Sequence, residues 1–191
     1  MDVFFVSTGL TALAEMGDRT QLLAFLLAAR YRQPLLIMLG ILLATLLNHM
    51  FAGLVGSWLA ALLEPQTLRW LLGLSFIVMA GWILVPDKFD NARLTASGMG
   101  VFAATLVTFF IAEMGDKTQI ATVALSARFD ALAWVVAGTT LGLMLANVPA
   151  IYLGDRFAHR LPIRAIQCVT AALFVILGIA TWLGAGKALG L

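Results

Sequence analysis

Six long apolar segments constrain this chain more than any other feature. Each is close to the ~20 residues that an α-helix needs to cross a hydrocarbon core about 30 Å thick. The segments run over about 3–29, 34–63, 68–85, 98–127, 131–153 and 163–183. They are continuous and do not alternate in polarity at every second residue, which favours helices over a transmembrane barrel. The sequence therefore predicts an all-α integral membrane protein with six transmembrane helices.

Composition places the chain in the same class. Hydrophobic residues make up 62% of it and charged residues 12%, whereas soluble domains average about 45–50% apolar and about 25% charged residues. The net charge of +2 is too small to indicate a nucleic-acid partner. The expected surroundings are a lipid bilayer.

The first and fourth segments carry the same polar motif, 98 positions apart. Residues 15–21 read EMGDRTQ, and residues 113–119 read EMGDKTQ. The same shift places Gly40 on Gly138. A seven-residue polar match in register with the glycines indicates a duplication. The predicted units are repeat 1 at 1–85, a cytoplasmic connection at 86–97 and repeat 2 at 98–191.

Three helices per repeat is an odd number, so the second copy must enter the membrane from the opposite side. The prediction is an inverted repeat, a common architecture of secondary transporters. One face would collect seven basic residues: Arg30, Arg32, Lys88, Arg93, Arg156, Arg160 and Arg164. The other would collect Arg69, Arg128 and Lys187. Because Lys and Arg accumulate on the cytoplasmic side, we expect a cytoplasmic (inner) membrane protein with both termini outside the cytoplasm.

Four acidic residues lie near the middle of apolar segments and are the strongest functional signal. They are Glu15, Asp18, Glu113 and Asp116. A charge at the bilayer centre costs about 2.5–3.5 kcal/mol on insertion scales, so an intramembrane acid marks a candidate functional site. Residues three apart share a helix face, and the two motif helices of an inverted repeat run antiparallel. We therefore expect the four carboxylates to face each other in one metal site.

The donor atoms of this site indicate the kind of cation. Carboxylate, amide and hydroxyl oxygens suit hard cations such as Mn²⁺, Ca²⁺ and Mg²⁺, whereas Zn²⁺ and Cu⁺ prefer thiolate or imidazole ligands. Against Arg19 and Lys117, the four acids leave a formal charge of −2, which one divalent cation would neutralise. Burial and crowding of like charges favour the neutral carboxyl group. Metal and protons would therefore compete for the same oxygens, which is the basis of cation/proton exchange.

Other polar residues in the segments are candidates for additional ligands or for gating. They are Gln21, Gln119, Thr20, Thr118, Arg19, Lys117, Asn48 and Asn147. A structural interpretation exists for most of them. Asp18 could pair with Lys117 and Asp116 with Arg19, which would join the helices. The glutamines, the asparagines and His49 could instead make hydrogen bonds between helices.

The motif E-x-G-D-[KR]-[TS], present at Glu15–Thr20 and again at Glu113–Thr118, is specific. Through this motif the chain resembles the family of Golgi cation/proton exchangers and bacterial manganese exporters. The stretches Leu47-Asn48-His49 and Ala146-Asn147-Val148-Pro149 are also similar to the family pattern. The resemblance covers the whole chain and implies a Mn²⁺ or Ca²⁺ transporter driven by protons moving in the opposite direction. It also implies that the four motif acids are the functional residues.

The resulting prediction is a transporter, not an enzyme, that exports Mn²⁺ from the cytoplasm in exchange for protons and needs no cofactor. A Ca²⁺/H⁺ antiporter with the same site and a passive divalent cation channel are the alternatives. An intramembrane enzyme would need a nucleophile or cofactor motif, and the sequence supplies neither. The sequence leaves open whether the protein works as a monomer or as a homodimer.

Overall fold

The computed structural model describes residues 2–85, 99–153 and 162–184, and within these ranges all regular structure is helical. Its helices are α1 (Asp2–Glu15), α2 (Arg19–Tyr31), α3 (Pro34–Leu62), α4 (Pro65–Ile83), α5 (Val101–Glu113), α6 (Lys117–Arg128), α7 (Leu132–Leu153) and α9 (Ile163–Trp182). The predicted connection at 86–97 lies outside the described residues. So do five of the basic residues used for orientation: Lys88, Arg93, Arg156, Arg160 and Lys187.

Among the described residues, four helices are long and apolar enough to cross a membrane, namely α3, α4, α7 and α9. Pro34 and Pro65 stand in the first turns of α3 and α4, where the missing N–H of proline leaves no helical hydrogen bond unmade. The helix α5 is apolar but shorter. The prediction of an all-helical chain is confirmed.

The first and fourth predicted segments are not continuous helices, and here the sequence-based expectation was wrong. Each is divided into two helices at its polar motif, α1 from α2 and α5 from α6. Gly17 (φ 81°) and Gly115 (φ 77°) occupy the left-handed region at the two breaks, which is strained for residues with a Cβ atom. The same glycine in both motif copies therefore produces the same interruption.

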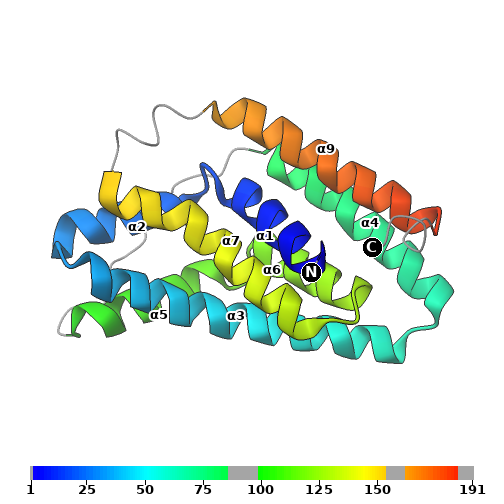
Figure 1. Cartoon of the computed structure of the whole chain (residues 1–191), viewed down its shortest axis with the longest axis horizontal. Helices are drawn as coiled ribbons and strands as arrows, with labels where there is room; N and C mark the ends of the chain where they lie inside the picture. The colour runs from blue at the N-terminus through cyan, green and yellow to red at the C-terminus, as the bar shows by residue number, and fades with distance from the viewer. Residues whose placement is uncertain (1, 86–98, 154–161, 185–191) are drawn as a thin grey trace.

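The helices pack side by side in one bundle (Figure 1). The helix α1 lies along α7, α3 runs beside α5 and α6, and α4 pairs with α9. Glycines permit the closest approaches. A Cβ atom on Gly138 would lie 2.6 Å from the carbonyl oxygen of Phe4, so α1 and α7 can meet at this distance only without a side chain there. Such small residues are typical of helix contacts in membranes.

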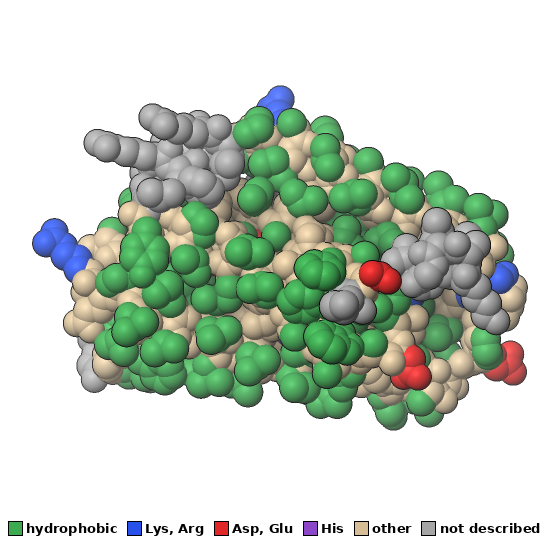
Figure 2. Space-filling view, in the orientation of Figure 1, with side chains coloured by type: hydrophobic (Ala, Val, Ile, Leu, Met, Phe, Trp, Pro, Cys, Tyr) green, Lys and Arg blue, Asp and Glu red, His purple; other side chains and the backbone are tan. Residues whose placement is uncertain are grey.

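The outer surface is apolar. Hydrophobic side chains cover most of the face in Figure 2, and few charged side chains interrupt them. Among the exposed residues are Phe51 (66% exposed), Ile111 (64%) and Leu35 (63%). Apolar surface of this extent is unfavourable in water and indicates contact with another apolar phase, here the lipid that the sequence predicts.

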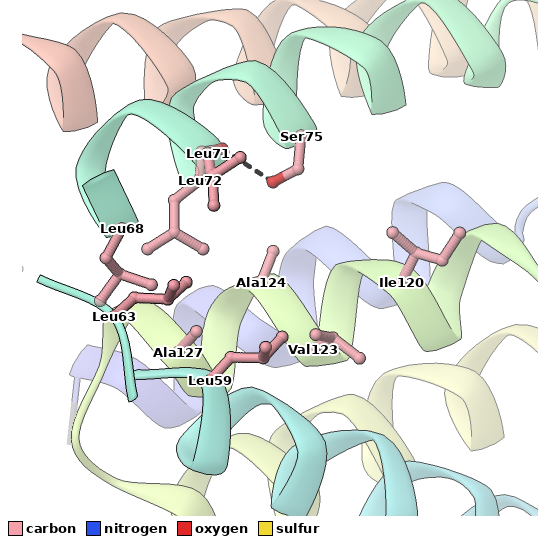
Figure 3. A pocket seen from close by; sticks show the side chains of 10 residues that line it. All are labelled: Leu59, Leu63, Leu68, Leu71, Leu72, Ser75, Ile120, Val123, Ala124 and Ala127. Atoms are coloured by element: carbon pink, nitrogen blue, oxygen red, sulfur yellow. Dashed lines mark hydrogen bonds between the residues drawn. The ribbon is translucent and has the colours of Figure 1, made fainter. Parts of the chain in front are cut away.

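A cavity of about 270 Å³ lies between α4, α6 and the end of α3 (Figure 3). Its lining is almost entirely aliphatic, with Leu71, Ile120 and Ala124 among the contributors, and the hydroxyl of its one polar residue, Ser75, donates to the carbonyl of Leu72. None of the four motif acids lines this cavity. It is therefore a packing gap beside the site-bearing helices and does not contain the chemistry.

Candidate metal centre

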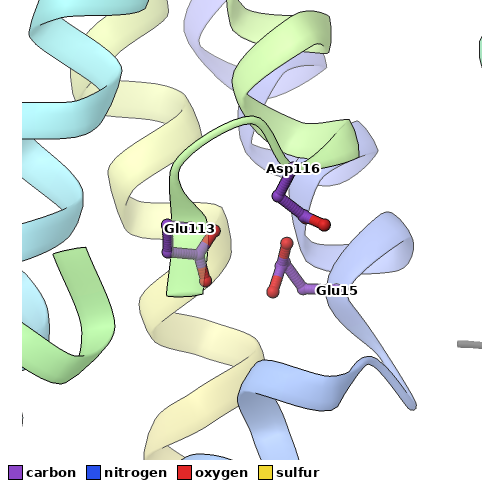
Figure 4. A group of neighbouring side chains, drawn as sticks. All are labelled: Glu15, Glu113 and Asp116. Atoms are coloured by element: carbon purple, nitrogen blue, oxygen red, sulfur yellow. The ribbon is translucent and has the colours of Figure 1, made fainter. Parts of the chain in front are cut away.

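The two motif breaks meet inside the molecule and bring three carboxyl groups together. Glu15 ends α1, Glu113 ends α5, and Asp116 is the N-cap residue of α6. One oxygen from each lies within 4.8 Å of the other two, and the three carboxyl groups point toward one another (Figure 4). All three residues are buried, with exposures of 0%, 1% and 3%. We call them the carboxylate cluster.

The fourth motif acid, Asp18, is buried but does not belong to the cluster. The spacing argument assumed a continuous helix, in which Asp18 would stand beside Glu15. Instead, Asp18 caps α2, and its carboxylate accepts from the backbone N–H of Thr20 at 3.4 Å. Its Oδ1 lies 2.5 Å from Nζ of Lys117, which is equally buried. The negative charge of Asp18 is therefore compensated by Lys117 of the second motif.

A second ion pair joins the two motifs, and in this pair the first motif supplies the basic residue and the second motif the acid. Arg19 lies 3.1 Å from Asp116, and its guanidinium also donates to the carbonyl of Ala112. The two pairs are the ones that the structural interpretation of the sequence predicted. They differ in exposure: the Arg19 side chain is 42% exposed, whereas that of Lys117 is 3% exposed. Two acids are thus paired, and the formal charge of −2 rests on Glu15 and Glu113.

Each glutamate uses one of its two oxygens within the protein. The Thr20 hydroxyl donates to Glu15 Oε2 at 2.7 Å, and the Thr118 hydroxyl donates to Glu113 Oε2 at 3.4 Å. The Oε1 atoms of both glutamates are buried and have no hydrogen-bond partner within the described residues. A buried polar atom ordinarily has a partner, so these two oxygens are suited to hold a cation or a proton.

The motif glutamines support the breaks, and their side-chain oxygens are already engaged. Gln21 accepts from the backbone N–H of Gly17 at 3.1 Å, and Gln119 accepts from that of Gly115 at 2.6 Å. Gln21 also donates to the carbonyl of Ala146 on α7 at 2.8 Å. This arrangement favours the structural interpretation of both glutamines over metal ligation.

The remaining candidates lie on helices next to the motifs. Asn48 donates to the carbonyl of Phe110, one turn before Glu113, at 3.1 Å. Asn147 donates to the carbonyl of Leu143 within its own helix at 3.1 Å, and its Oδ1 has no partner in the part of the chain described. Asn48 therefore joins two helices, as the structural interpretation expected.

Buried hydroxyl groups were not singled out from the sequence. Ser7 and Thr11 precede Glu15 at intervals of four residues, and Thr122 and Ser126 follow Thr118 at the same interval. All four are 0–2% exposed. The four-residue spacing was the signal that could have found them, because it places each set on one helix face.

The donor set fits a hard divalent cation. The cluster offers carboxylate oxygens, with hydroxyl oxygens next to them, and its charge of −2 would be neutralised by one such ion. His49 is buried on α3, but no histidine or cysteine belongs to the cluster. The geometry therefore supports binding of an oxygen-seeking cation and gives no reason to expect Zn²⁺ or Cu⁺.

Comparison with known proteins agrees with this chemistry. A Vibrio cholerae protein with the name "Putative manganese exporter" is 50% identical over 95% of this chain and 90% of its own length. GDT1-like protein sll0615 of Synechocystis is 27% identical over 91% of this chain and 93% of its own length. The divalent cation/proton antiporter GDT1 of Saccharomyces cerevisiae is 25% identical, covering 91% of this chain and 80% of the yeast protein. No solved structure matches the chain.

The model of one family matches nearly the whole chain, in two stretches, residues 3–91 and 101–188. Its description is that of the divalent cation/proton antiporter GDT1. The resemblance inferred from the repeated motif is thereby confirmed, as is the prediction that the protein is a membrane transporter and not an enzyme. This chain belongs to the GDT1 family of divalent cation/proton antiporters.

Proposed function

We propose that this protein exports Mn²⁺ from the cytoplasm in exchange for protons at the carboxylate cluster. The observation that carries the proposal is the pair of buried glutamate oxygens, Glu15 Oε1 and Glu113 Oε1, that have no protein partner within the described residues and lie beside Asp116. The Vibrio relative, at 50% identity, supports Mn²⁺ as the ion. The transported ion and protons suffice for this activity, and no cofactor is required.

Exchange follows from competition for the same oxygens. With Asp18 and Asp116 paired to Lys117 and Arg19, Glu15 and Glu113 can be neutralised either by one divalent cation or by two protons. An uncompensated charge this deeply buried is strongly unfavourable. The empty, doubly ionised site is therefore avoided, and release of the metal requires uptake of protons. This coupling lets a proton gradient drive metal movement.

The proposed topology counts α1 with α2, and α5 with α6, as one interrupted membrane crossing each. Together with α3, α4, α7 and α9 this gives six crossings in two inverted repeats. The identical glycine breaks and the reciprocal ion pairs between the motifs support a duplicated, oppositely oriented unit. The excess of Lys and Arg at one face, seven against three, supports an inner-membrane protein with both termini outside the cytoplasm.

Ca²⁺ is the alternative substrate, because it uses the same oxygen donors. A passive cation channel is the alternative mechanism, and it would need no proton exchange. One experiment separates all three: metal flux in proteoliposomes, with Mn²⁺ and Ca²⁺ tested separately, with and without an imposed pH gradient. Uphill Mn²⁺ movement that collapses with the gradient is expected. Metal flux that runs only down the metal concentration gradient and does not depend on the pH gradient would establish a channel.

A further inference from the structure

Two rows of buried hydroxyl groups lead from the carboxylate cluster toward one end of the molecule. On α1, Ser7 and Thr11 precede Glu15, and on α6, Thr122 and Ser126 follow the motif. With a helical rise of 1.5 Å per residue, each row extends about 12 Å from its motif. That is roughly 40% of a ~30 Å hydrocarbon core. The rows could therefore connect the cluster to one membrane face.

Three of these hydroxyls lack the hydrogen bond that a helical Ser or Thr usually makes. Such groups commonly donate to a carbonyl one turn earlier, as Thr8 does to Phe4 and Thr122 does to Thr118, both at 2.8 Å. The hydroxyls of Ser7, Thr11 and Ser126 have no partner among the described residues, although the side chains are 0–2% exposed. Buried polar groups of this kind are typically satisfied by internal water.

The two rows belong to neighbouring helices. The helices α1 and α6 are in contact, and Leu10 and Ala14 of α1 share a core cluster with Leu125 of α6. The start of α1 and the end of α6 lie toward the same end of the molecule in Figure 1. The helix α7 covers α1 closely, since a Cβ atom on Gly142 would lie 2.9 Å from Cβ of Thr11. The hydroxyls thus lie in the interior.

The repeat-equivalent positions on the opposite side of the cluster are mostly apolar. Shifted by 98 positions, Ser7, Thr11, Thr122 and Ser126 correspond to Thr105, Phe109, Ala24 and Ala28. Phe109 and Ala24 belong to an apolar cluster formed by α2, α3, α5 and α7. The one hydroxyl in that set, on Thr105, donates to the carbonyl of Val101 at 2.8 Å. Unpartnered hydroxyls therefore occupy these positions in only one half.

We propose that Ser7, Thr11, Thr122 and Ser126 line a proton path between the carboxylate cluster and the face at which α6 ends. Each hydroxyl or intervening water accepts a proton on one side and releases one on the other, so no group along the path changes charge. Thr11 packs closely against Gly142 of α7 and Ser126 against Gly56 of α3, and such close packing favours protons over a hydrated divalent ion. The inference rests on the proposed cation/proton exchange and adds the route of the proton.

The test uses hydroxyl deletions that preserve size: Ser7→Ala, Thr11→Val and Ser126→Ala, singly and combined. In proteoliposomes two rates are measured for each, Mn²⁺ movement driven by a pH gradient and exchange of labelled for unlabelled Mn²⁺ at equal pH. Exchange of metal for metal needs no net proton transfer. The combined variant should lose about tenfold or more of the gradient-driven rate, about 1.4 kcal/mol in the barrier, and keep its exchange rate.

Thr105→Val is the matched control, because Thr105 is the repeat counterpart of Ser7 and its hydroxyl is already partnered. It should change neither rate. An unchanged gradient-driven rate in the combined variant would overturn the proton path. Loss of both rates together would also overturn it, since it would assign the hydroxyls to packing or to the metal route. Wild-type flux that ignores the gradient would instead refute the proposed exchange itself.

Discussion

At the scale of single residues, the site separates four chemically similar acids into two roles. Asp18 and Asp116 are each paired with a cation of the other repeat, whereas Glu15 and Glu113 carry the uncompensated charge. Threonine hydroxyls orient one oxygen of each glutamate, and the other oxygen has no partner in the described part of the chain. In the proposed exchange, the glutamates are therefore the residues whose neutralisation accompanies the transport cycle.

Replacing either glutamate by glutamine should abolish transport. Glu15→Gln or Glu113→Gln keeps the side-chain size but removes the charge that metal and protons neutralise. Gradient-driven Mn²⁺ flux in proteoliposomes, normalised to the amount of inserted protein, should fall to background. Arg30→Ala, in the last turn of α2, is the control and should transport normally. Wild-type rates in either glutamine variant would show that the site assignment is wrong.

The buried pair of Asp18 and Lys117 should contribute mainly to structure. Asp18→Asn leaves the ammonium of Lys117 buried without its carboxylate at 2.5 Å, and breaking such a pair is destabilising by about 3–5 kcal/mol. Adding Lys117→Gln should recover most of the loss, because neither partner of the pair then carries a charge. Unfolding of the purified protein in detergent measures both. Equal destabilisation by the single and the double variant would contradict this role.

At the scale of elements, the decisive feature is the interruption of two apolar segments at Gly17 and Gly115. The breaks end α1 and α5 at a glutamate and let α2 and α6 begin with a capping aspartate. A continuous helix would have kept each glutamate and aspartate on one surface. The interruption instead directs the carboxyl groups of two segments toward one another (Figure 4).

Alanine at the two glycines should have unequal effects. Both positions are left-handed, and a side chain there costs about 1–2 kcal/mol. A Cβ atom on Gly17 would also lie 2.7 Å from Cγ2 of Ile163 on α9, whereas one on Gly115 would meet nothing within 4 Å. Gly17→Ala should therefore lower the detergent melting temperature more than Gly115→Ala. Equal decreases in melting temperature would mean that the close contact between Gly17 and Ile163 of α9 does not affect stability.

At the scale of the whole molecule, the proposed orientation places the end of α2 inside the cytoplasm and the connection between α6 and α7 outside. Single cysteines at Arg32 and Asp130, introduced after replacement of the exposed Cys168, test this with a membrane-impermeant thiol reagent. In intact cells Asp130→Cys should react and Arg32→Cys should not. Both should react after permeabilisation. The reverse pattern in intact cells would show that the protein has the opposite orientation in the membrane and would contradict the proposed topology.

Much of the protein could be predicted from its amino-acid order. Long apolar runs must become helices, because hydrocarbon leaves no other partner for the backbone. The repeated motif indicated the candidate acids, and it predicted the pairing of Asp18 with Lys117 and of Asp116 with Arg19, which the structure confirms. These inferences depend on composition and spacing, which the linear chain contains in full.

Only the tertiary structure decided how two nearly identical motifs differ. Apart from Arg19 and Lys117, the motifs have the same residues, so spacing cannot distinguish Asp18 from Asp116. Packing places Lys117 in the interior against Asp18, while the longer Arg19 reaches Asp116 from a half-exposed position and Asp116 stays in the carboxylate cluster. The side of the cluster that is lined by unpartnered hydroxyls was also decided by packing, because burial depends on neighbours distant in sequence.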